Sequence, residues 1–572
     1  MPSIESLRTV AVDTTVSTYN CLNERLSRFS PLVIVVGTVA GTCFYLRVAR
    51  VYRSSDRPLH LRIAGWLLRQ ARQLSYVKAK IDKELSSARQ DILHSIHKDD
   101  PDRDFIKALP ARGFDSDEVL ALAKRYDSYS HANVAGGCVS GAVYTDRPEE
   151  HLDLLTKLYR MFAYSNPLHP DVFPGVRRME AEVIRMVLNM YHAPEDGSGS
   201  LTTGGTESIF MACVAARNRA YAKGITEPTI VIGRTAHAAF DKAADWLGLR
   251  VRHVPVDEDN RLSVKHMRRA IDSSTALVGL FNAPLVKRLV ALQLVGSAPS
   301  FSTGCIDPID EIAKLGVKYD IPVHVDACLG GFLVPFLEEA GFTPPFRFDF
   351  RVPGYGYAPK GSSVVLYRSK ELHHHQYFAI TDWPGGIYAT PTLSGSRAGA
   401  SAAAAWATLL WTGRDEYVSR ARAILTATRR MANLVKQVPG LELFGASDVS
   451  VVAMRSNQFN IFAVSDRLVK RGYSLNTLQN PDAIHVCLTM NHATDEAVDT
   501  FVAELRAVCA EVAALPDGGG KTGTAALYGL AAQIPDRSLV SEMTWVFLDA
   551  CYAMPPLDSD GHESKEGQSA AK

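Results

Sequence analysis

The sequence predicts an α/β protein with a large domain built on a mostly parallel sheet and a smaller C-terminal α+β domain. Three short β-branched runs are typical of buried strands, at residues 229–232 (TIVI), 323–325 (VHV) and 363–366 (SVVL). Helical stretches at 208–222 and 309–319 lie between them. Because strands that alternate with helices usually pair in parallel, we expect a sheet covered by helices on both faces.

A change of pattern marks the second domain. Strand-like runs at 450–453 and 484–488 are separated by long helical segments, which is typical of an α+β arrangement. We therefore place the large domain at 116–397 and the small domain at 398–555. The polar residues 556–572 predict a disordered tail.

An uncharged apolar run near the N-terminus predicts a membrane-spanning helix. Residues 29–46 (FSPLVIVVGTVAGTCFYL) carry no charge, and the run lies at the short end of bilayer spans, whose lower limit is about 17 residues. More arginines follow the run than precede it, which favours the cytosol for the chain that follows. We expect residues 1–28 in a lumen, a helical stalk at 47–115, and the thin membrane of the endoplasmic reticulum as the location. A buried or interfacial helix, or a signal-peptide core, is the alternative.

Composition excludes some classes of function. The 62 Lys and Arg residues balance 61 Asp and Glu residues, so no overall basic field is present to bind nucleic acid. The 9 cysteines form no CxxC pair and are expected to be reduced thiols, with a zinc site as the minor alternative. Three adjacent histidines, 373–375, cannot all face one ion, so we expect a solvated loop there and no metal site.

A glycine-containing turn that opens a helix is the first candidate for chemistry. Residues 202–208 read TTGGTES. Gly204 and Gly205 allow the backbone to approach a ligand closely, and the free N–H groups of a helix start favour a phosphate. The hydroxyls of Thr206 and Ser208 are further candidate donors. Such turns also cap helices without binding anything, so the pattern indicates a phosphate site only in combination with other residues.

Two strand ends carry the other candidate residues. Asp326 follows the run 323–325, at the edge where parallel sheets bind ligands. A carboxylate there can pair with the protonated nitrogen of a pyridine ring and keep the ring an electron sink. His237 follows the run 229–232 and could stack on a flat cofactor ring. Helix capping by Asp326 and a structural role for His237 are the competing interpretations.

Taken in order, the phosphate turn, His237 and Asp326 resemble the group II decarboxylase branch of fold-type I enzymes, which use pyridoxal phosphate (PLP). Longer stretches are similar to the sphingosine-1-phosphate lyase family, across nearly the whole chain from the membrane segment to about residue 552. These stretches are 139–144 (VSGAVY), 162–171 (FAYSNPLHPD), 236–243 (AHAAFDKA), 324–332 (HVDACLGGF), 355–361 (YGYAPKG) and 394–397 (SGSR). The resemblance implies a fold-type I, PLP-binding large domain.

The resemblance also implies a reaction. The family cleaves the C2–C3 bond of phosphorylated sphingoid bases by a retro-aldol reaction, giving a long-chain aldehyde and phosphoethanolamine, in sites shared across a homodimer. A lipid substrate agrees with the predicted membrane helix. The implied PLP-binding residues are Gly204, Gly205, Thr206, His237, Asp326 and Ser396, of which His237 and Asp326 are also implied to be catalytic. The implied substrate-facing residues are Tyr144, Asn166, His169, Lys360, Tyr388 and Arg397. Ser396 and Arg397 are expected in a loop that reaches the neighbouring subunit's site.

The chain departs from the family where the Schiff-base lysine should lie. The family places that lysine in a Ser-x-Asp-x-His-Lys stretch, but here residues 348–354 (FDFRVPG) run directly into 355–360 (YGYAPK). A lysine that holds the cofactor covalently speeds exchange with substrate, so its absence predicts severely reduced turnover. Lys360 is the nearest lysine. Its expected role is a charge near phosphate, and a weak substitute role in catalysis is the alternative.

A second departure is an insertion in the same domain. Strand-forming 275–278 (TALV) should lead almost directly into 295–299 (VGSAP), but residues 279–294 (GLFNAPLVKRLVALQL) intervene. The addition must either loop out or rebuild the strand. A loss and a gain together suggest a misassembled reading of a gene whose true product is intact. The rival hypothesis is a lyase relative that has lost catalysis, and the transcript sequence distinguishes the two.

Two other functions compete with a lyase. An amino-acid decarboxylase of the same branch would need no membrane helix and would release carbon dioxide. A membrane-tethered pseudoenzyme would bind phosphorylated sphingoid bases or pair with an active subunit without producing aldehyde, and the missing lysine is its support.

Overall fold

The computed structural model describes residues 59–97, 105–129, 132–146, 148–279, 289–346, 361–515, 518 and 537–553. Contacts divide the chain into two compact units, residues 1–98 with 534–572 and residues 99–533. The predicted membrane segment 29–46, the predicted tail 556–572 and Lys360 lie outside the described residues. Within the described ranges, no helix is both long enough and apolar enough to span a bilayer.

The first unit contains three described helices, α3 (Leu59–Ala71), α4 (Ser75–His97) and α17 (Arg537–Ala550). Although α4 and α17 are far apart in the sequence, they pack against each other. Arg72, just after α3, donates two hydrogen bonds to the Glu542 carboxylate, at 2.7 and 2.8 Å. The described residues 59–97 and 537–553 therefore pack together.

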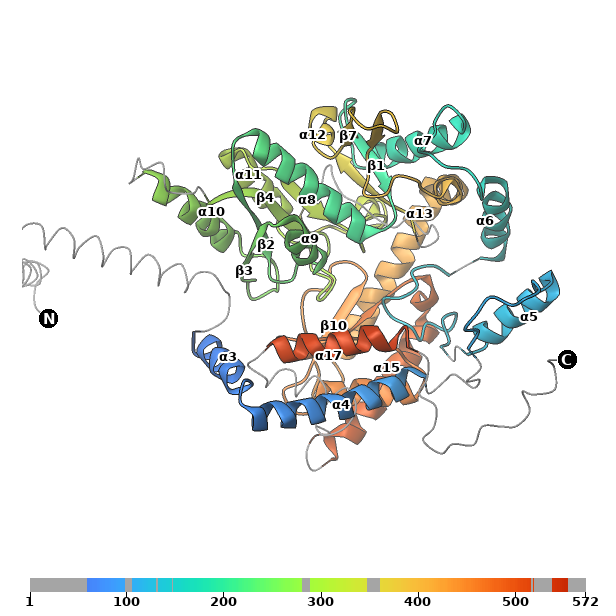
Figure 1. Cartoon of the computed structure of the whole chain (residues 1–572). Helices are drawn as coiled ribbons and strands as arrows, with labels where there is room; N and C mark the ends of the chain where they lie inside the picture. Colours follow the sequence, from blue (N-terminus) through green and yellow to red (C-terminus); the bar gives the residue numbers. More distant parts are fainter. Residues whose placement is uncertain are drawn as a thin grey trace, which may run out of the picture. The chain divides into compact units, whose positions relative to one another are not determined.

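The second unit contains a parallel sheet of four strands in the order β3 (Arg250–Val254), β2 (Glu227–Gly233), β4 (Leu289–Ser297) and β5 (Val323–Asp326) (Figure 1). The predicted strands at 229–232 and 323–325 are confirmed. Ser297 is the register partner of Asp326, so β4 and β5 end at the same edge of the sheet.

A separate two-stranded sheet pairs β1 (Ser198–Thr202) with β6 (Ser363–Tyr367) in antiparallel fashion. The predicted strand at 363–366 is confirmed, but its expected place in the parallel sheet is wrong. Among the described strands, β5 and β6 do not pair with each other. Burial on both faces identified β6 as a strand, but burial carries no information about strand direction or neighbours.

Helix α8 (Gly205–Ala222) joins the two sheets. It packs against β4 of the parallel sheet and against β1 and β6 of the antiparallel sheet (Figure 1). The predicted helices at 208–222 and 309–319 are confirmed, the second as α11 (Ile309–Tyr319). The start of α8, which carries the predicted phosphate turn, therefore lies where β1 ends.

The predicted strand at 275–278 is wrong. These residues belong to helix α10 (Val264–Gly279), and the following strand β4 begins at Leu289. The last part of the insertion, 289–294, thus supplies most of β4, which corresponds to the rebuilt strand rather than to a loop. A short apolar run with one threonine fits the end of an amphipathic helix as well as a strand, which explains the error.

A second four-stranded sheet, the C-terminal sheet, has the order β11 (Asn476–Leu478), β12 (Ala483–Cys487), β10 (Val451–Arg455) and β9 (Glu442–Leu443). All its pairs are antiparallel. The predicted strands at 450–453 and 484–488 are confirmed. The sheet is followed by α15 (Asp495–Ala513), and α14 (Ile461–Lys470) lies between β10 and β11.

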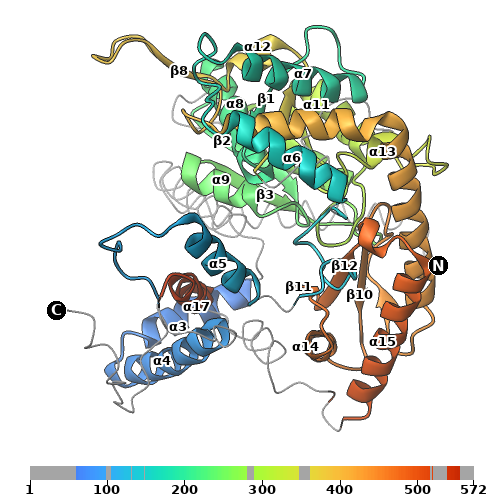
Figure 2. The same cartoon turned by 90° about the vertical axis from the view of Figure 1, so that its right-hand side faces the viewer.

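Helix α13 (Gly399–Val435) connects the two sheet layers of the second unit. It packs against α6 (Glu149–Phe162) and α7 (Pro174–Met190), and also against β10 and α15 (Figure 2). Figure 2 shows its sharp bend, which falls at Gly413 with φ 63° and ψ 170°. Glycine tolerates this positive φ without a steric cost.

The remaining described elements are short or peripheral. They are α5 (Ser116–Asp127), α9 (Ala239–Leu247), η1 (Val334–Phe336), α12 (Lys370–His374), β7 (Phe378–Ile380), β8 (Tyr388–Thr390) and η2 (Met490–His492). One buried cluster includes Leu188 of α7, Leu294 of β4, Ile312 of α11, Phe462 of α14 and Leu505 of α15. The core of the second unit therefore extends from the parallel sheet to the antiparallel C-terminal sheet formed by β9 to β12.

The solvated loop predicted at 373–375 is wrong for His373. This residue lies in α12, is 2% exposed and bonds Ser198 at 2.7 Å and Ser200 at 2.8 Å. Its ring stacks on Tyr367. Burial lowers the pKa of His373 to about 4. The residue is a neutral part of the core beside β1.

Candidate active site

Asp326 and His237 lie near each other at the carboxyl edge of the parallel sheet. Asp326 ends β5, is 5% exposed, and accepts a hydrogen bond from the Cys328 N–H at 3.1 Å. Burial raises the pKa of the Asp326 carboxyl, while the Cys328 N–H and the nearby His237 act in the opposite direction. A buried carboxylate with this little compensation is suited to a cationic partner.

His237 follows β2 and is held from both sides. Its Nδ1 accepts the Ala239 N–H at 3.0 Å, which fixes the ring at the start of α9, and its ring meets Phe301 edge-to-face with 6.3 Å between centroids. The ring is thus oriented by the chain itself, as a residue that stacks on a flat cofactor requires.

Two hydroxyls at the same edge were not predicted. The side-chain oxygens of Ser297 and Thr235 are buried and have no hydrogen-bond partner among the described residues. Ser297 is the register partner of Asp326, so both side chains point to the same face of the sheet. Buried polar atoms are nearly always bonded, so these two are candidates for contact with a polar ligand. The sequence could have indicated both residues through their positions at the ends of strands, where parallel sheets bind ligands.

The end of β4 is itself fixed by a buried acid. The Asp307 carboxylate accepts N–H bonds from Ser297 at 2.8 Å and from Leu262 at 2.7 Å. Burial raises the pKa of Asp307 to about 6. Asp307 therefore holds the backbone on which Ser297 lies, while the Ser297 hydroxyl remains available.

The phosphate turn begins where β1 ends. Gly204 precedes the first residue of α8, Gly205, so the first N–H groups of the helix belong to the predicted phosphate-binding residues, including Thr206. Ser208 is placed differently from expectation. Its hydroxyl is buried and bonds Thr202 at 2.7 Å and Ser363 at 3.1 Å, so it joins β1, α8 and β6.

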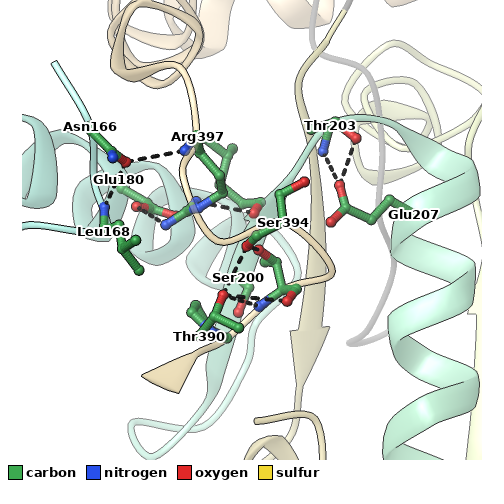
Figure 3. A network of polar contacts seen from close by, with 12 residues as sticks. Asn166, Leu168, Glu180, Ser200, Thr203, Glu207, Thr390, Ser394 and Arg397 are labelled. Carbon is green, nitrogen blue, oxygen red and sulfur yellow. Dashed lines mark hydrogen bonds and ion pairs between the residues drawn. The ribbon is translucent and has the colours of Figure 1, made fainter. Parts of the chain in front are cut away.

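Glu207 is a further residue at this site that was not predicted. Its side chain is buried in the first turn of α8. One carboxylate oxygen accepts both the N–H and the hydroxyl of Thr203, each at 2.6 Å (Figure 3). The other oxygen accepts the Leu393 N–H at 3.2 Å. A glutamate three residues after a helix cap often accepts a hydrogen bond from the backbone just before the helix. This sequence pattern could have predicted the contact with Thr203.

The loop at 390–397 carries Ser396 and Arg397. The Asn166 side chain accepts the Arg397 N–H at 3.1 Å (Figure 3). It also donates to the Ser396 hydroxyl at 3.1 Å. The Arg397 guanidinium binds Glu180 of α7. The structure thus brings together Asn166, Ser396 and Arg397, and places the Arg397 charge on an acid of its own chain.

The other predicted substrate-facing residues lie in three places. Tyr388 starts β8, and its hydroxyl lies over Gly395, where an added Cβ would come within 2.4 Å. His169 is exposed and follows the Asn166 segment. Tyr144 donates to the Gly141 carbonyl at 2.8 Å and lines a cavity of about 40 Å³. Other residues lining this cavity are Cys328, Phe332, Ile424, Cys487 and Thr489.

These residues fit PLP in two respects. The buried Asp326 carboxylate fits a protonated ring nitrogen, with unpartnered hydroxyls beside it, and the start of α8 fits a phosphate. The stretch from which the family's lysine is missing, 347–360, lies outside the described residues.

The fold and this arrangement define a pyridoxal-dependent enzyme of the decarboxylase class. The family model described as "Pyridoxal-dependent decarboxylase conserved domain" matches residues 154–456. The cofactor implied is PLP.

Comparison with known proteins narrows the class. A sphingosine-1-phosphate lyase of Drosophila melanogaster is 42% identical, covering 87% of this chain and 90% of that protein. Sphingosine-1-phosphate lyase 1 of Rattus norvegicus is 39% identical, covering 94% of this chain and 93% of that protein. The chain belongs to the sphingosine-1-phosphate lyase family.

Similar solved structures support the family and the fold. A sphingosine-1-phosphate lyase of Burkholderia pseudomallei is 31% identical with a TM-score of 0.67, covering 79% of this chain and 98% of that one. A glutamate decarboxylase of Lactobacillus brevis has a TM-score of 0.60 at 18% identity, covering 72% of this chain and 96% of that one, which is a likeness of fold alone.

Proposed function

We propose that this chain serves the PLP-dependent cleavage of phosphorylated sphingoid bases to a long-chain aldehyde and phosphoethanolamine. The names of relatives that match over most of the chain support the substrate class. The observation that carries the chemistry is the buried Asp326 carboxylate beside His237 at the carboxyl edge of the parallel sheet.

Each group of residues has a separate task. Asp326 holds a proton on the ring nitrogen, and the unpartnered Ser297 hydroxyl lies on the same side of the sheet. Gly204, Gly205 and Thr206 present N–H groups to the cofactor phosphate. When bound, PLP supplies the sink for the electron pair released as the C2–C3 bond breaks. His237, fixed by Ala239 and Phe301, limits the orientation of the ring.

The missing lysine stretch limits turnover by this chain. Without a lysine to attach the cofactor, the chain would hold PLP only through the residues around its phosphate and ring, and it would provide no lysine-assisted exchange with a substrate amine. For Lys360 we propose the role that the family resemblance implies, which is to supply a positive charge near phosphate. We therefore expect binding of cofactor and substrate with little product.

The test compares this chain with a variant in which a Ser-x-Asp-x-His-Lys stretch is inserted between Gly354 and Tyr355. Each is incubated with PLP and a phosphorylated sphingoid base, and aldehyde and phosphoethanolamine are measured. The proposal expects both products in equal amounts from the insertion variant and little from the parent chain. Carbon dioxide release from amino acids, with no aldehyde, would instead support the decarboxylase alternative.

We also propose a membrane tether, a location in the endoplasmic reticulum and a homodimer with shared sites. The uncharged run at 29–46 supports the tether. Large apolar side chains exposed around the β7–β8 hairpin support the dimer, because monomers rarely expose such groups together. They are Tyr377, Phe378, Ile380, Trp383, Ile387 and Leu393. Native mass spectrometry of the detergent-extracted chain tests the dimer, and a purely monomeric species would contradict it.

A further inference from the structure

The start of α8 and the 390–397 loop are joined by one carboxylate. Glu207 lies within the turn whose neighbouring N–H groups face the proposed phosphate, and its two oxygens bond in opposite directions. One accepts both donors of Thr203 (Figure 3). The other accepts the Leu393 N–H, from a segment 186 residues away in the sequence. The side chain is 7% exposed, so water competes little for these bonds.

A negative charge at this place needs an explanation. A carboxylate near a helix start is favourable for the helix but repels a phosphate bound at the same turn. Ser208, one residue later, satisfies the local hydroxyl bonds between β1, α8 and β6 without any charge. The Glu207 carboxylate differs from Ser208 because it bonds the backbone of the 390–397 loop as well as the turn.

The loop is held at its other end by different residues. Asn166 bonds Ser396 and the Arg397 backbone, and Glu180 binds the Arg397 guanidinium. Within the loop, the hydroxyls of Thr390 and Thr392 donate to the Ser394 carbonyl at 2.8 and 3.0 Å. The Glu207 carboxylate bonds this loop to Thr203 of the phosphate turn, and the Arg397 guanidinium donates to the Leu201 carbonyl just before that turn.

We propose that Glu207 is a positioning residue that couples phosphate occupancy of the 202–206 turn to the order of the 390–397 loop. An anion that binds the N–H groups at the start of α8 reduces the motion of the turn. Because Glu207 is bonded to Leu393, the loop that carries Ser396 and Arg397 then also moves less. The coupling rests on the proposed phosphate site, whereas the bridge from Glu207 to Leu393 does not.

Two substitutions separate the charge of Glu207 from its reach. Glu207→Gln removes the charge and leaves one acceptor oxygen, so it cannot accept from both the Thr203 N–H and the Leu393 N–H as the two carboxylate oxygens do. Glu207→Asp keeps the charge but is one methylene shorter, so it cannot span the two partners. Glu150→Gln is the matched control, because Glu150 is an exposed glutamate in the first turn of α6.

The experiment is hydrogen exchange by mass spectrometry on peptides covering 388–397, using the full chain with and without inorganic phosphate. Without phosphate, we expect exchange in this loop to be about tenfold faster in both Glu207 variants than in the parent chain, with the control unchanged. Unchanged exchange in both variants would overturn the bridge. Thermal melting identifies any variant whose whole unit is destabilised.

Phosphate titration completes the test. We expect phosphate to slow loop exchange in the parent chain but not in the variants, and we expect calorimetry to show that Glu207→Gln binds phosphate at least as tightly as the parent chain. A merely structural role would weaken both loop order and phosphate binding. If phosphate and PLP fail to bind the parent chain, the proposed function fails, while the exchange difference without ligand still decides the Glu207 bridge.

Discussion

Arg397 and Glu180 form an ion pair that is mostly shielded from solvent, with side chains 11% and 16% exposed. The guanidinium also donates to the Leu201 carbonyl at 3.4 Å, at the end of β1. The charge of Arg397 is thus largely balanced inside its own chain. In this structure, the pair fastens the 390–397 loop to α7 and β1.

Breaking this pair should be costly. Glu180→Gln leaves the Arg397 charge uncompensated in a mostly buried place, and we expect the free energy of unfolding to fall by about 3 kcal/mol. Urea denaturation measures the change. Glu442→Gln is the control, because its pair with Arg455 is exposed and worth less than about 1 kcal/mol. Equal effects of the two substitutions would contradict a structural role for the Arg397 pair.

Ser297→Ala tests the unpartnered hydroxyl beside Asp326. Since the hydroxyl has no partner among the described residues, we expect the free energy of unfolding to change by less than about 0.5 kcal/mol. We expect PLP affinity to fall about fivefold, as for one lost hydrogen bond. Ser300→Ala is the contrasting variant. The Ser300 hydroxyl bonds Thr303 at 2.7 Å, so its loss should cost about 1 kcal/mol of stability. Unchanged PLP affinity in Ser297→Ala would remove Ser297 from the site.

Asp326→Asn tests the partner of the ring nitrogen. The neutral amide keeps an acceptor for the Cys328 N–H but cannot hold a proton on the ring, so PLP affinity should fall at least tenfold. Stability should not decrease, because burial opposes the charged carboxylate. Fluorescence titration with PLP measures affinity. Lost stability with unchanged affinity would favour the helix-capping interpretation.

Buried His485 should contribute to acid sensitivity. It lies in β12, its Nδ1 is 3.1 Å from the Ser302 carbonyl, and burial lowers its pKa to about 4 from 6.5. The unfolded chain takes up this proton below about pH 6.5 and the folded chain does so only near pH 4. The stability it contributes is therefore present above pH 6.5 and lost as the pH falls toward 4.

We expect His485→Phe to flatten this dependence by up to about 1.4 kcal/mol per pH unit between pH 6.5 and 4. Urea unfolding at several pH values measures the slope. His374→Phe, at an exposed position, should leave the slope unchanged. A parent-like slope in His485→Phe would show that another group controls the transition.

Local patterns predicted the strands and helices that depend on nearby residues, such as β2, β5 and α11. The direction of β6 was not predictable, because burial on both faces identifies a strand but carries no information about its direction or its neighbours. The role of Glu207 depends on Leu393, 186 residues away, and no local pattern records such a contact. Asp326 and His237 were found because strand ends in parallel sheets have a known position, and the same rule applied to Ser297 would have found it as well.

The most direct test of the central claim is an absorbance scan of the purified chain with PLP, before and after borohydride, followed by peptide mapping. We expect that PLP binds through the carboxyl-edge residues, washes out, and leaves no reduced adduct on any lysine of this chain. An adduct mapped to Lys360 would instead identify a substitute lysine, and a chain that binds no PLP would rule out the proposed site.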